Sequence, residues 1–426
     1  MDDDRRTAYL TLIDIENNKA YSNLALNHHI TISKPNSKAL VRRLVYGVLE
    51  NRMYLDYVIG HYLTDPLQKL NTSDRTVLRI GLYQLIFMDS IPSYAAVSET
   101  VNLAKHYCKG REGFINAVLR NYERSGKEIA LPDRETNESE YLSVKYSYAK
   151  WIVELWLSEY ESEFTEELLA AGNKTPELTI RPNLLKNSKK GLKKRLIEKG
   201  YEVSESHINN IALRVKGEDL IETNLYKDGM FTVQDESSMA AVDLLDPQPN
   251  EFVIDVCAAP GGKTMYIAER MENRGRILAR DLYKKKLDIL NREAARLGIT
   301  IVESGTFDAT KTDGELEASA DRVLVDAPCS GLGVVRRKPE IKYKEWDGEL
   351  EHLPEIQRQI LAASSEYVKK GGMLLYSTCT INPAENQDVV RDFLKANNEF
   401  KEQESIQLFP SINDTDGFYI CSMRRY

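Results

Sequence analysis

The chain has 426 residues, of which 42% are hydrophobic and 29% charged, so it can bury more than one core and we expect two or three domains. No segment approaches the roughly 20 apolar residues of a membrane span, and the N-terminus lacks the apolar core of a secretion signal, so we expect a cytoplasmic protein without a membrane partner. Five cysteines without a Cys-x-x-Cys pair, and only six histidines, argue against a disulfide framework and against a metal site.

The N-terminal part is predicted to be all helical. Apolar residues recur with a spacing near 3.6 in three segments, 40–49, 77–87 and 95–104. The polar segment 125–140 that follows is typical of a linker, because it is charged and contains a proline. We therefore place an all-α domain at residues 1–130.

The next region mixes both kinds of element and predicts a small α+β module at residues 140–232. Its expected elements are helices within 141–171, a strand at 178–183, a helix at 187–199 and an extended segment at 230–233. Residues 186–199 carry seven Lys and Arg residues against one Glu, although the net charge of the chain is -8. Such a run is either a solvated face or a phosphate contact, and the sequence leaves both open.

Residues 233–426 predict an α/β fold, because short apolar runs alternate with helical segments. The runs begin at Phe252, Arg276, Thr300, Arg322, Met373 and Phe418. This pattern is typical of a mainly parallel, doubly wound sheet with helices on both faces, whose ligands lie at the carboxyl ends of the strands.

The first of these runs ends at Asp255 and leads into a turn of small residues that contains Gly261 and Gly262. Such a turn lets the backbone approach a carboxylate or a nucleotide closely, beside the amides of a helix start. A Walker A loop is disfavoured, because Cys257 stands where that motif requires glycine. Asp281 follows the next run, a placement that suits either contact with ribose hydroxyls or a helix cap, and Asp308 follows the third run with the same alternatives.

Two cysteines lie in distinctive strings: Cys329 in Asp326-Ala-Pro-Cys-Ser-Gly, and Cys379 in Tyr-Ser-Thr-Cys-Thr-Ile-Asn-Pro-Ala-Glu-Asn. A cysteine near a strand is most often a small buried apolar residue. The order of the cofactor-like turn and the two strings instead suggests a nucleotide-like cofactor beside a thiol.

These strings, together with Asp-Val-Cys-Ala-Ala-Pro-Gly-Gly-Lys-Thr from Asp255, resemble the motifs of the RNA cytosine-5 methyltransferases, in that family's order. The segments around Tyr94 and Asn116 resemble a NusB-like domain. The combination resembles the RsmB (Sun or Fmu) type, which methylates small-subunit ribosomal RNA in bacteria. The resemblance implies a Rossmann-like, S-adenosylmethionine-dependent methyltransferase domain at residues 233–426.

The resemblance also implies roles for individual residues. Cys379 is the nucleophile that adds to carbon 6 of cytosine, Cys329 assists release of the adduct, and Asp326 contacts the base. We further expect the pKa of Cys379 to be lowered by nearby cationic or amide groups. The expected cofactor contacts are Cys257, Ala258, Ala259, Pro260, Gly261, Gly262, Lys263, Asp281, Asp308 and Asp326.

The expected partner is 16S ribosomal RNA before full assembly of the subunit, bound by a monomer without a metal ion. The target cytosine must leave its stack, because the thiol and the methyl donor approach its ring from opposite faces. Arg336, Arg337 and Lys338 are candidates for the flanking phosphates, and the NusB-like domain and the α+β module are candidates for binding the rest of the RNA.

Alternatives stay open at this stage. A transfer RNA substrate would use the same chemistry. A DNA cytosine-5 methyltransferase would place its nucleophile in the Pro-Cys string, at Cys329. A binding module of the antitermination kind would need neither Cys379 nor S-adenosylmethionine.

Overall fold

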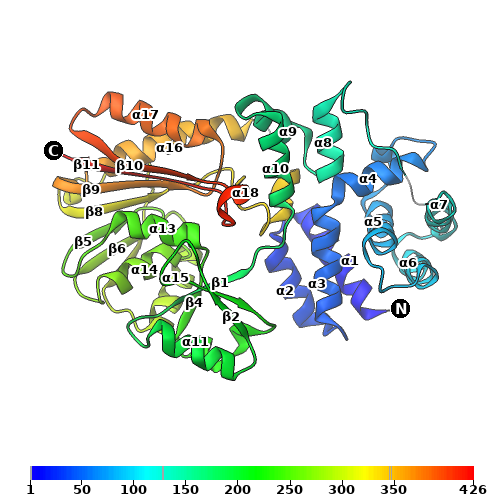
Figure 1. Cartoon of the computed structure of the whole chain (residues 1–426), viewed down its shortest axis with the longest axis horizontal. Helices are drawn as coiled ribbons and strands as arrows, with labels where there is room; N and C mark the ends of the chain where they lie inside the picture. Colours follow the sequence, from blue (N-terminus) through cyan, green and yellow to red (C-terminus); the bar gives the residue numbers. More distant parts are fainter. Residues whose placement is uncertain (1, 127–128, 345, 347) are drawn as a thin grey trace. The chain divides into compact units, whose positions relative to one another are not determined.

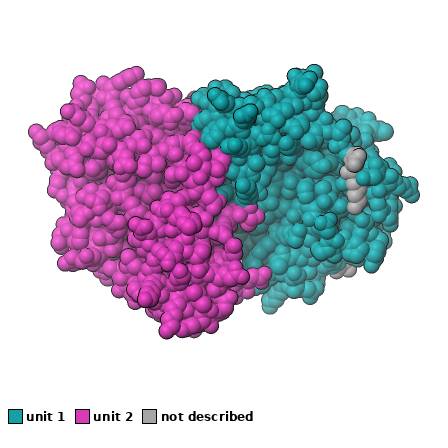
Figure 2. Space-filling view, in the orientation of Figure 1, with its two compact units in different colours: residues 1–174, 335–345 teal, residues 175–334, 346–426 magenta. Residues whose placement is uncertain are grey.

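The computed structural model describes residues 2–126, 129–344, 346 and 348–426. It contains two compact units, residues 1–174 with 335–345, and residues 175–334 with 346–426 (Figure 2). Residue 1 of the predicted first domain and residues 127 and 128 of the predicted linker lie outside the described residues. The boundary after residue 174 falls within the predicted module at 140–232. The three predicted domain boundaries stay predictions, because one compact unit can hold more than one domain.

The first unit confirms the predicted all-helical N-terminal region (Figure 1). Its α-helices are α1 (Asp3–Asn18), α2 (Ser22–Ser33), α3 (Lys38–Glu50), α4 (Arg52–His61), α5 (Thr72–Phe87), α6 (Ser93–Tyr107), α7 (Glu112–Arg124), α8 (Glu138–Tyr146), α9 (Lys150–Glu159) and α10 (Ser162–Gly172). The apolar stripe of α3, which includes Leu44 and Val48, packs into the same core as Leu78 of α5. The spacing near 3.6 therefore corresponds to buried helix faces.

A short segment of the C-terminal half, residues 335–345, belongs to this helical unit. Its 3-10 helix η4 (Pro339–Tyr343) places Lys342 in a fully buried position, with the ammonium 4.2 Å from the ring centroid of Tyr148. The same ammonium donates to the Glu50 carbonyl at 3.3 Å and to Asn173. Burial lowers the pKa of Lys342 to about 7.

The second unit contains a small antiparallel sheet in the order β2-β3-β1-β4, which confirms the expected α+β character. Its strands are β1 (Leu178–Pro182), β2 (Glu202–Glu205), β3 (Leu213–Lys216) and β4 (Phe231–Val233), with helices α11 (Lys189–Glu198) and α12 (Asn224–Lys227). Leu192 and Leu196 of α11 share a core with Ile180 of β1.

Much of the basic run at 186–199 is engaged within this unit. Lys186 donates to the carbonyls of Asp228 and Arg296, and Lys189 and Lys193 both pair with Glu205. These contacts favour a structural role for part of the run over a continuous phosphate-binding face.

The large sheet has the strand order β10-β11-β9-β8-β5-β6-β7. Its strands are β5 (Phe252–Asp255), β6 (Arg276–Asp281), β7 (Val302–Thr306), β8 (Ala320–Asp326), β9 (Val368–Thr378), β10 (Phe400–Leu408) and β11 (Phe418–Arg425). β7, β6, β5, β8 and β9 pair in parallel, and β11 pairs antiparallel with β9 and β10.

Helices cover both faces of this sheet (Figure 1). They are α13 (Glu236–Leu245), α14 (Gly262–Arg270), α15 (Lys284–Leu297), α16 (Glu349–Ser365) and α17 (Gln387–Ala396), followed by the short α18 (Pro410–Asn413). Val253 and Leu324 pack with the helices α13 to α15, whereas Ile254 and Val323 pack with α16 and α17. Because adjacent residues of one strand are buried on opposite faces, the strands appear in the sequence as continuous apolar runs.

A buried charge network holds the helical unit together. Arg79 donates to Asp56 at 2.7 and 2.8 Å and to Glu16 at 2.7 Å, and its side chain is 4% exposed. Burial alone would raise the pKa of Glu16, but Arg79, Arg52 and Arg75 outweigh it and lower the pKa.

We expect Arg79→Met to destabilise the helical unit by about 3–5 kcal/mol, because it leaves two carboxylates without their main cationic partner. Urea unfolding followed by tryptophan fluorescence checks this, since Trp151 and Trp156 lie in this unit. Lys69→Met is the matched control: it breaks an ion pair with Asp65 in which both side chains are 67% exposed, so a change below about 1 kcal/mol is expected. Equal effects of the two substitutions would contradict the role of Arg79.

Candidate functional site

Polar residues gather at the carboxyl edge of the parallel sheet, as the sequence predicts. Asp255, Asp281 and Asp326 are the last residues of β5, β6 and β8. Because these three strands are neighbours in the order β8-β5-β6, their carboxyl ends lie on one edge. The predicted cofactor turn begins at this edge, directly after Asp255.

The turn from Cys257 to Gly262 depends on its backbone conformation. Gly261 has φ +111°, and an added Cβ there would lie 2.9 Å from Cγ of Leu290, so only glycine fits without strain. The Ala258 amide donates to the Arg280 carbonyl at 2.8 Å, which ties the turn to β6. Gly262 opens α14, whose first amide groups have no acceptor within the helix. Burial raises the pKa of the Cys257 thiol, which disfavours its use as a thiolate.

Asp255 is buried beneath this turn. Its Oδ2 accepts a hydrogen bond from the Thr264 hydroxyl at 2.7 Å, whereas its Oδ1 has no partner among the described residues. Burial raises the pKa of Asp255 to about 7, against the hydrogen bond from Thr264, and the negative charge of Asp326 adds to the rise.

Asp281 and Asp308 both accept hydrogen bonds from backbone amides of turns. Asp281 accepts the amides of Ala259 at 3.3 Å and Tyr283 at 3.0 Å. Asp308 accepts the hydroxyl of Thr310 at 2.7 Å and its amide at 3.1 Å, and these bonds lower the pKa of Asp308. Asp281 therefore braces the cofactor turn, and contact of either residue with a ligand stays a prediction.

Asp326 is fixed at both carboxylate oxygens. Lys263 of α14 donates to Oδ2 at 2.7 Å, and Ser377 of β9 donates to Oδ1 at 2.9 Å. The Lys263 ammonium also lies 4.8 Å from the ring centroid of Phe418. The turn and the Asp-Ala-Pro-Cys string are thus joined by an ion pair that neither string reveals alone.

Cys329 and Cys379 are brought together by the pairing of β8 with β9. Asp326 and Ser377 are register partners, and the Ala327 amide continues the ladder to the Ser377 carbonyl at 2.9 Å. The two sulfur atoms lie 3.2 Å apart, within hydrogen-bond distance, and neither cysteine forms a disulfide. The hydrogen bond with Cys379, followed by burial and the charge of Cys379, raises the pKa of Cys329.

The structure adds two residues to which the sequence analysis gave no role, Glu385 and Asn386. Both are fully buried. The side chain of Glu385 bonds to Ser330, the neighbour of Cys329, and the side chain of Asn386 bonds to Thr378, the neighbour of Cys379. Their only signal in the sequence was membership of the Asn-Pro-Ala-Glu-Asn string.

The predicted phosphate-binding run lies in the helical unit. Arg336 is buried there, and the Lys338 ammonium lies 5.8 Å from the ring centroid of Tyr21. Its contact with RNA stays a prediction.

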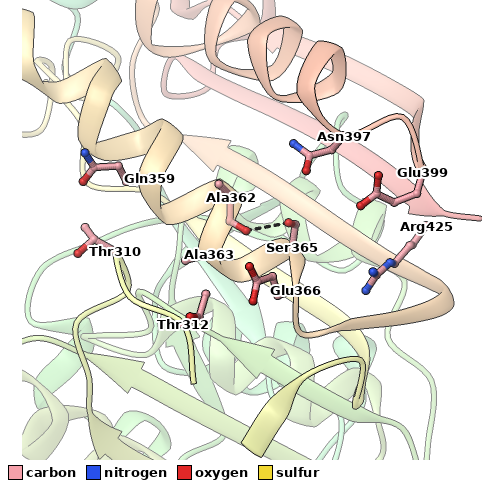
Figure 3. A pocket seen from close by; sticks show the side chains of 10 residues that line it. All are labelled: Thr310, Thr312, Gln359, Ala362, Ala363, Ser365, Glu366, Asn397, Glu399 and Arg425. Carbon is pink, nitrogen blue, oxygen red and sulfur yellow. Dashed lines mark hydrogen bonds between the residues drawn. The ribbon is translucent and has the colours of Figure 1, made fainter. Parts of the chain in front are cut away.

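A cavity of about 460 Å³ lies at the opposite edge of the sheet (Figure 3). It includes Glu366, whose carbonyl accepts the Ala318 amide at the amino-terminal side of β8 and β9. None of the ten lining residues is a predicted site residue, so the cavity is separate from the cysteine pair.

Known protein families match the chain in three successive segments. The NusB family matches residues 2–124, the ferredoxin-like domain of RsmF/B-like methyltransferases matches 148–221, and the 16S rRNA methyltransferase RsmB/F family matches 242–424. A Bacillus subtilis protein named a probable ribosomal RNA small subunit methyltransferase B is 36% identical over 99% of this chain and 98% of its own length. The chain belongs to the RsmB/F family of methyltransferases. The predicted family, the order of NusB-like, α+β and Rossmann-like parts, and the assignment as an enzyme are confirmed.

Other members and one solved structure agree with the RsmB/F assignment. Ribosomal RNA small subunit methyltransferase B of Erwinia tasmaniensis is 31% identical over 90% of each chain. The crystal structure of PH0851 superposes with a TM-score of 0.84 at 28% identity, over 98% of each chain.

Neither a membrane-spanning helix nor a metal-binding cluster occurs in the described part of the RsmB/F chain. None of its helices has the length and apolar character to cross a membrane. None of its groups of His, Cys, Asp and Glu side chains has an arrangement suited to a metal ion.

The raised pKa of Asp255 predicts a pH-dependent stability. The folded protein binds the Asp255 proton up to a pH of about 7, whereas the unfolded chain releases it near the ordinary value of 3.8. This stabilisation is complete below the unfolded pKa and is lost as the pH rises through 7, by at most about 1.4 kcal/mol per pH unit. The side chain in Asp255→Asn does not titrate in this range. The free energy of unfolding of this variant, measured in urea and compared with wild type, should therefore increase between pH 5 and pH 8. If the free energies of unfolding of the two proteins changed with pH in parallel, the raised pKa of Asp255 would be contradicted.

Proposed function

We propose that this chain transfers a methyl group from S-adenosylmethionine to carbon 5 of a cytosine in small-subunit ribosomal RNA, through a covalent adduct between Cys379 and carbon 6. The observation that carries this proposal is the pair of cysteine thiols, 3.2 Å apart and not joined as a disulfide, at the edge that bears the cofactor turn. The small-subunit substrate rests on the relatives, which are named for that ribosomal subunit.

The residues of the turn fit the cofactor. The backbone conformation at Gly261, which requires glycine, allows a ligand to approach closely. The buried Oδ1 of Asp255 has no hydrogen-bond partner among the described residues and is an unused polar atom at the carboxyl edge. We assign Cys257 to Lys263, together with Asp281, Asp308 and Asp326, to the binding of the cofactor. S-adenosylmethionine supplies the electrophilic methyl group that the activated carbon 5 accepts.

We assign different protonation states to the two thiols. The hydrogen bond with Cys379 and burial raise the pKa of Cys329, so we assign the protonated thiol to Cys329 and the nucleophilic sulfur to Cys379. The Cys379 sulfur forms a bond to carbon 6 and makes carbon 5 an enamine-like nucleophile.

Formation of the adduct also prepares its release. Once the Cys379 sulfur is a neutral thioether, the negative charge that raised the pKa of Cys329 is gone. Cys329 can then lose its proton to water and, as a thiolate, accept the proton on carbon 5. The electrons of that C–H bond restore the 5,6 double bond and expel Cys379 as a thiolate.

Asp326 is positioned to bind the base edge. Its carboxylate is held by Lys263 and Ser377 and remains 31% exposed. We assign it a hydrogen bond from the exocyclic amine of cytosine, which holds the ring beside the two thiols. The target base is expected to leave its stack to reach both thiols.

The test is transfer of labelled methyl groups to unmodified small-subunit RNA by wild type, Cys379→Ala and Cys329→Ala, with adducts resolved on a denaturing gel. Cys379→Ala should lose activity by roughly 10⁴-fold or more and form no adduct, as expected for loss of a covalent nucleophile. Cys329→Ala should methylate the RNA once and accumulate the adduct, because only release is impaired.

Three outcomes would overturn separate parts of the proposal. An active Cys379→Ala enzyme contradicts the nucleophile. Loss of the adduct in Cys329→Ala alone would favour the arrangement of DNA cytosine-5 methyltransferases. Labelling of transfer RNA but not of ribosomal RNA would contradict the substrate and leave the chemistry intact.

A further inference from the structure

A buried carboxylate lies behind the cysteine pair. Glu385 is the last residue of the 3-10 helix η5 (Pro383–Glu385) and has no exposed surface. Its Oε2 accepts the Ser330 amide at 2.8 Å and the Gln357 side-chain amide at 3.1 Å, and its Oε1 accepts the Asn382 side-chain amide at 3.0 Å. All three donors are neutral.

These bonds clamp Cys329 from both sides. Ser330, the next residue, is held through its backbone amide, and its hydroxyl lies 2.7 Å from the Thr380 hydroxyl. Pro328, the preceding residue, is held through its carbonyl, which accepts Gln357 at 2.9 Å. Gln357 uses the same amide group for Pro328 and for Glu385, so α16 closes the clamp.

The neighbouring residue, Asn386, clamps Cys379 in the same way. Its Oδ1 accepts the Thr378 hydroxyl at 2.5 Å, and its Nδ2 donates to the Thr380 carbonyl at 3.1 Å. The residues on both sides of each cysteine are therefore hydrogen-bonded to the side chain of Glu385, of Asn386, or of Gln357, which itself bonds to Glu385. A shift of the Glu385 backbone would move both thiols.

We propose that Glu385 is a positioning residue for the cysteine pair: its buried carboxylate sets the separation of the two sulfur atoms, and its negative charge favours the protonated form of Cys329. The inference deepens the proposed function and rests on it for the catalytic consequence. Its geometric part, the separation of the two thiols, stands independently.

The charge effect agrees in sign with this role. After the hydrogen bond, burial and the charge of Cys379, the negative charge of Glu385 is a further cause that raises the pKa of Cys329. Other groups also bound this network: Tyr376 donates to the Glu385 backbone carbonyl at 2.6 Å, and Arg358 on α16 pairs with Asp392 of α17.

Glu385→Gln removes the charge and creates a donor conflict, while the side-chain volume is kept. The new amide oxygen can still accept Ser330 and Gln357, but the new amino group then meets the amino group of Asn382. Adding Asn382→Asp supplies an acceptor at that point and returns one negative charge to the cluster. The double variant is therefore a charge-relocating rescue.

The first readout needs no RNA. Phenylarsine oxide bridges two adjacent thiols by forming two As–S bonds and releasing water, and mass spectrometry maps the bridge to Cys329 and Cys379. We expect Glu385→Gln to slow bridging about 10-fold and the double variant to restore it. Asp321→Asn is the matched control: it neutralises a carboxylate that accepts the Phe252 amide at 2.8 Å near the amino end of β8, and it should bridge as wild type does.

The second readout is catalytic. Glu385→Gln should lower the single-turnover methylation rate about 10- to 100-fold with cofactor affinity unchanged, as misplacement of reacting groups does. In the pH profile of the rate of adduct release, the inflection that reports ionisation of Cys329 should shift to lower pH. Gln357→Met, which loosens only the Cys329 side, should slow release more than adduct formation and provides a second variant if Glu385→Gln folds poorly.

Unchanged bridging and an unchanged pH profile in Glu385→Gln would overturn the positioning role, while wild-type production of 5-methylcytosine would still support the proposed function. Slower bridging in Glu385→Gln, together with a wild-type protein that makes no 5-methylcytosine, would instead keep the geometry and overturn the proposed function. Failure of Asn382→Asp to restore either readout would show that the loss came from general destabilisation.

Discussion

The 3.2 Å contact between Cys329 and Cys379 depends on the parallel pairing of β8 with β9. The residues that carry these thiols are fifty positions apart in the sequence, and helix α16 is inserted between their strands. Because parallel neighbours end at the same edge, the crossover through α16 returns the chain to the point where the second thiol is needed. The proposed chemistry, the base contact of Asp326 and the clamp of Glu385 all require this adjacency.

Electrostatics at this edge follows from burial as much as from ion pairs. Asp255 and Asp326 lie on neighbouring strands, and the structure reduces their repulsion in two ways. Lys263 compensates the charge of Asp326, and the raised pKa of Asp255 favours its neutral form near neutral pH. Lys263 therefore links the cofactor turn to the segment from Asp326 to Cys329, so a ligand bound at the turn is expected to affect the position of that segment.

The sequence predicted the elements whose burial pattern is strong. All six apolar runs lie in or overlap strands of the large sheet, because both faces of that sheet are covered. Strand β10 was not predicted, since it is an edge strand with mostly exposed residues such as Lys401 and Glu402. The resemblance to a known family supplied the roles of the cysteines. The contacts of Glu385 and Asn386 could not be predicted from the sequence, because the role of a buried polar residue depends on partners that are distant in the chain.

The most direct test of the account is to locate the covalent bond. On the proposed mechanism, RNA that contains 5-fluorocytidine at the target position cannot release the adduct, because carbon 5 then bears fluorine in place of the proton that we assign Cys329 to remove. Peptide mapping of the trapped complex should find the nucleotide on the peptide that contains Cys379, in wild type and in Cys329→Ala alike. A nucleotide attached to the Cys329 peptide would contradict the assigned division of roles between the two thiols.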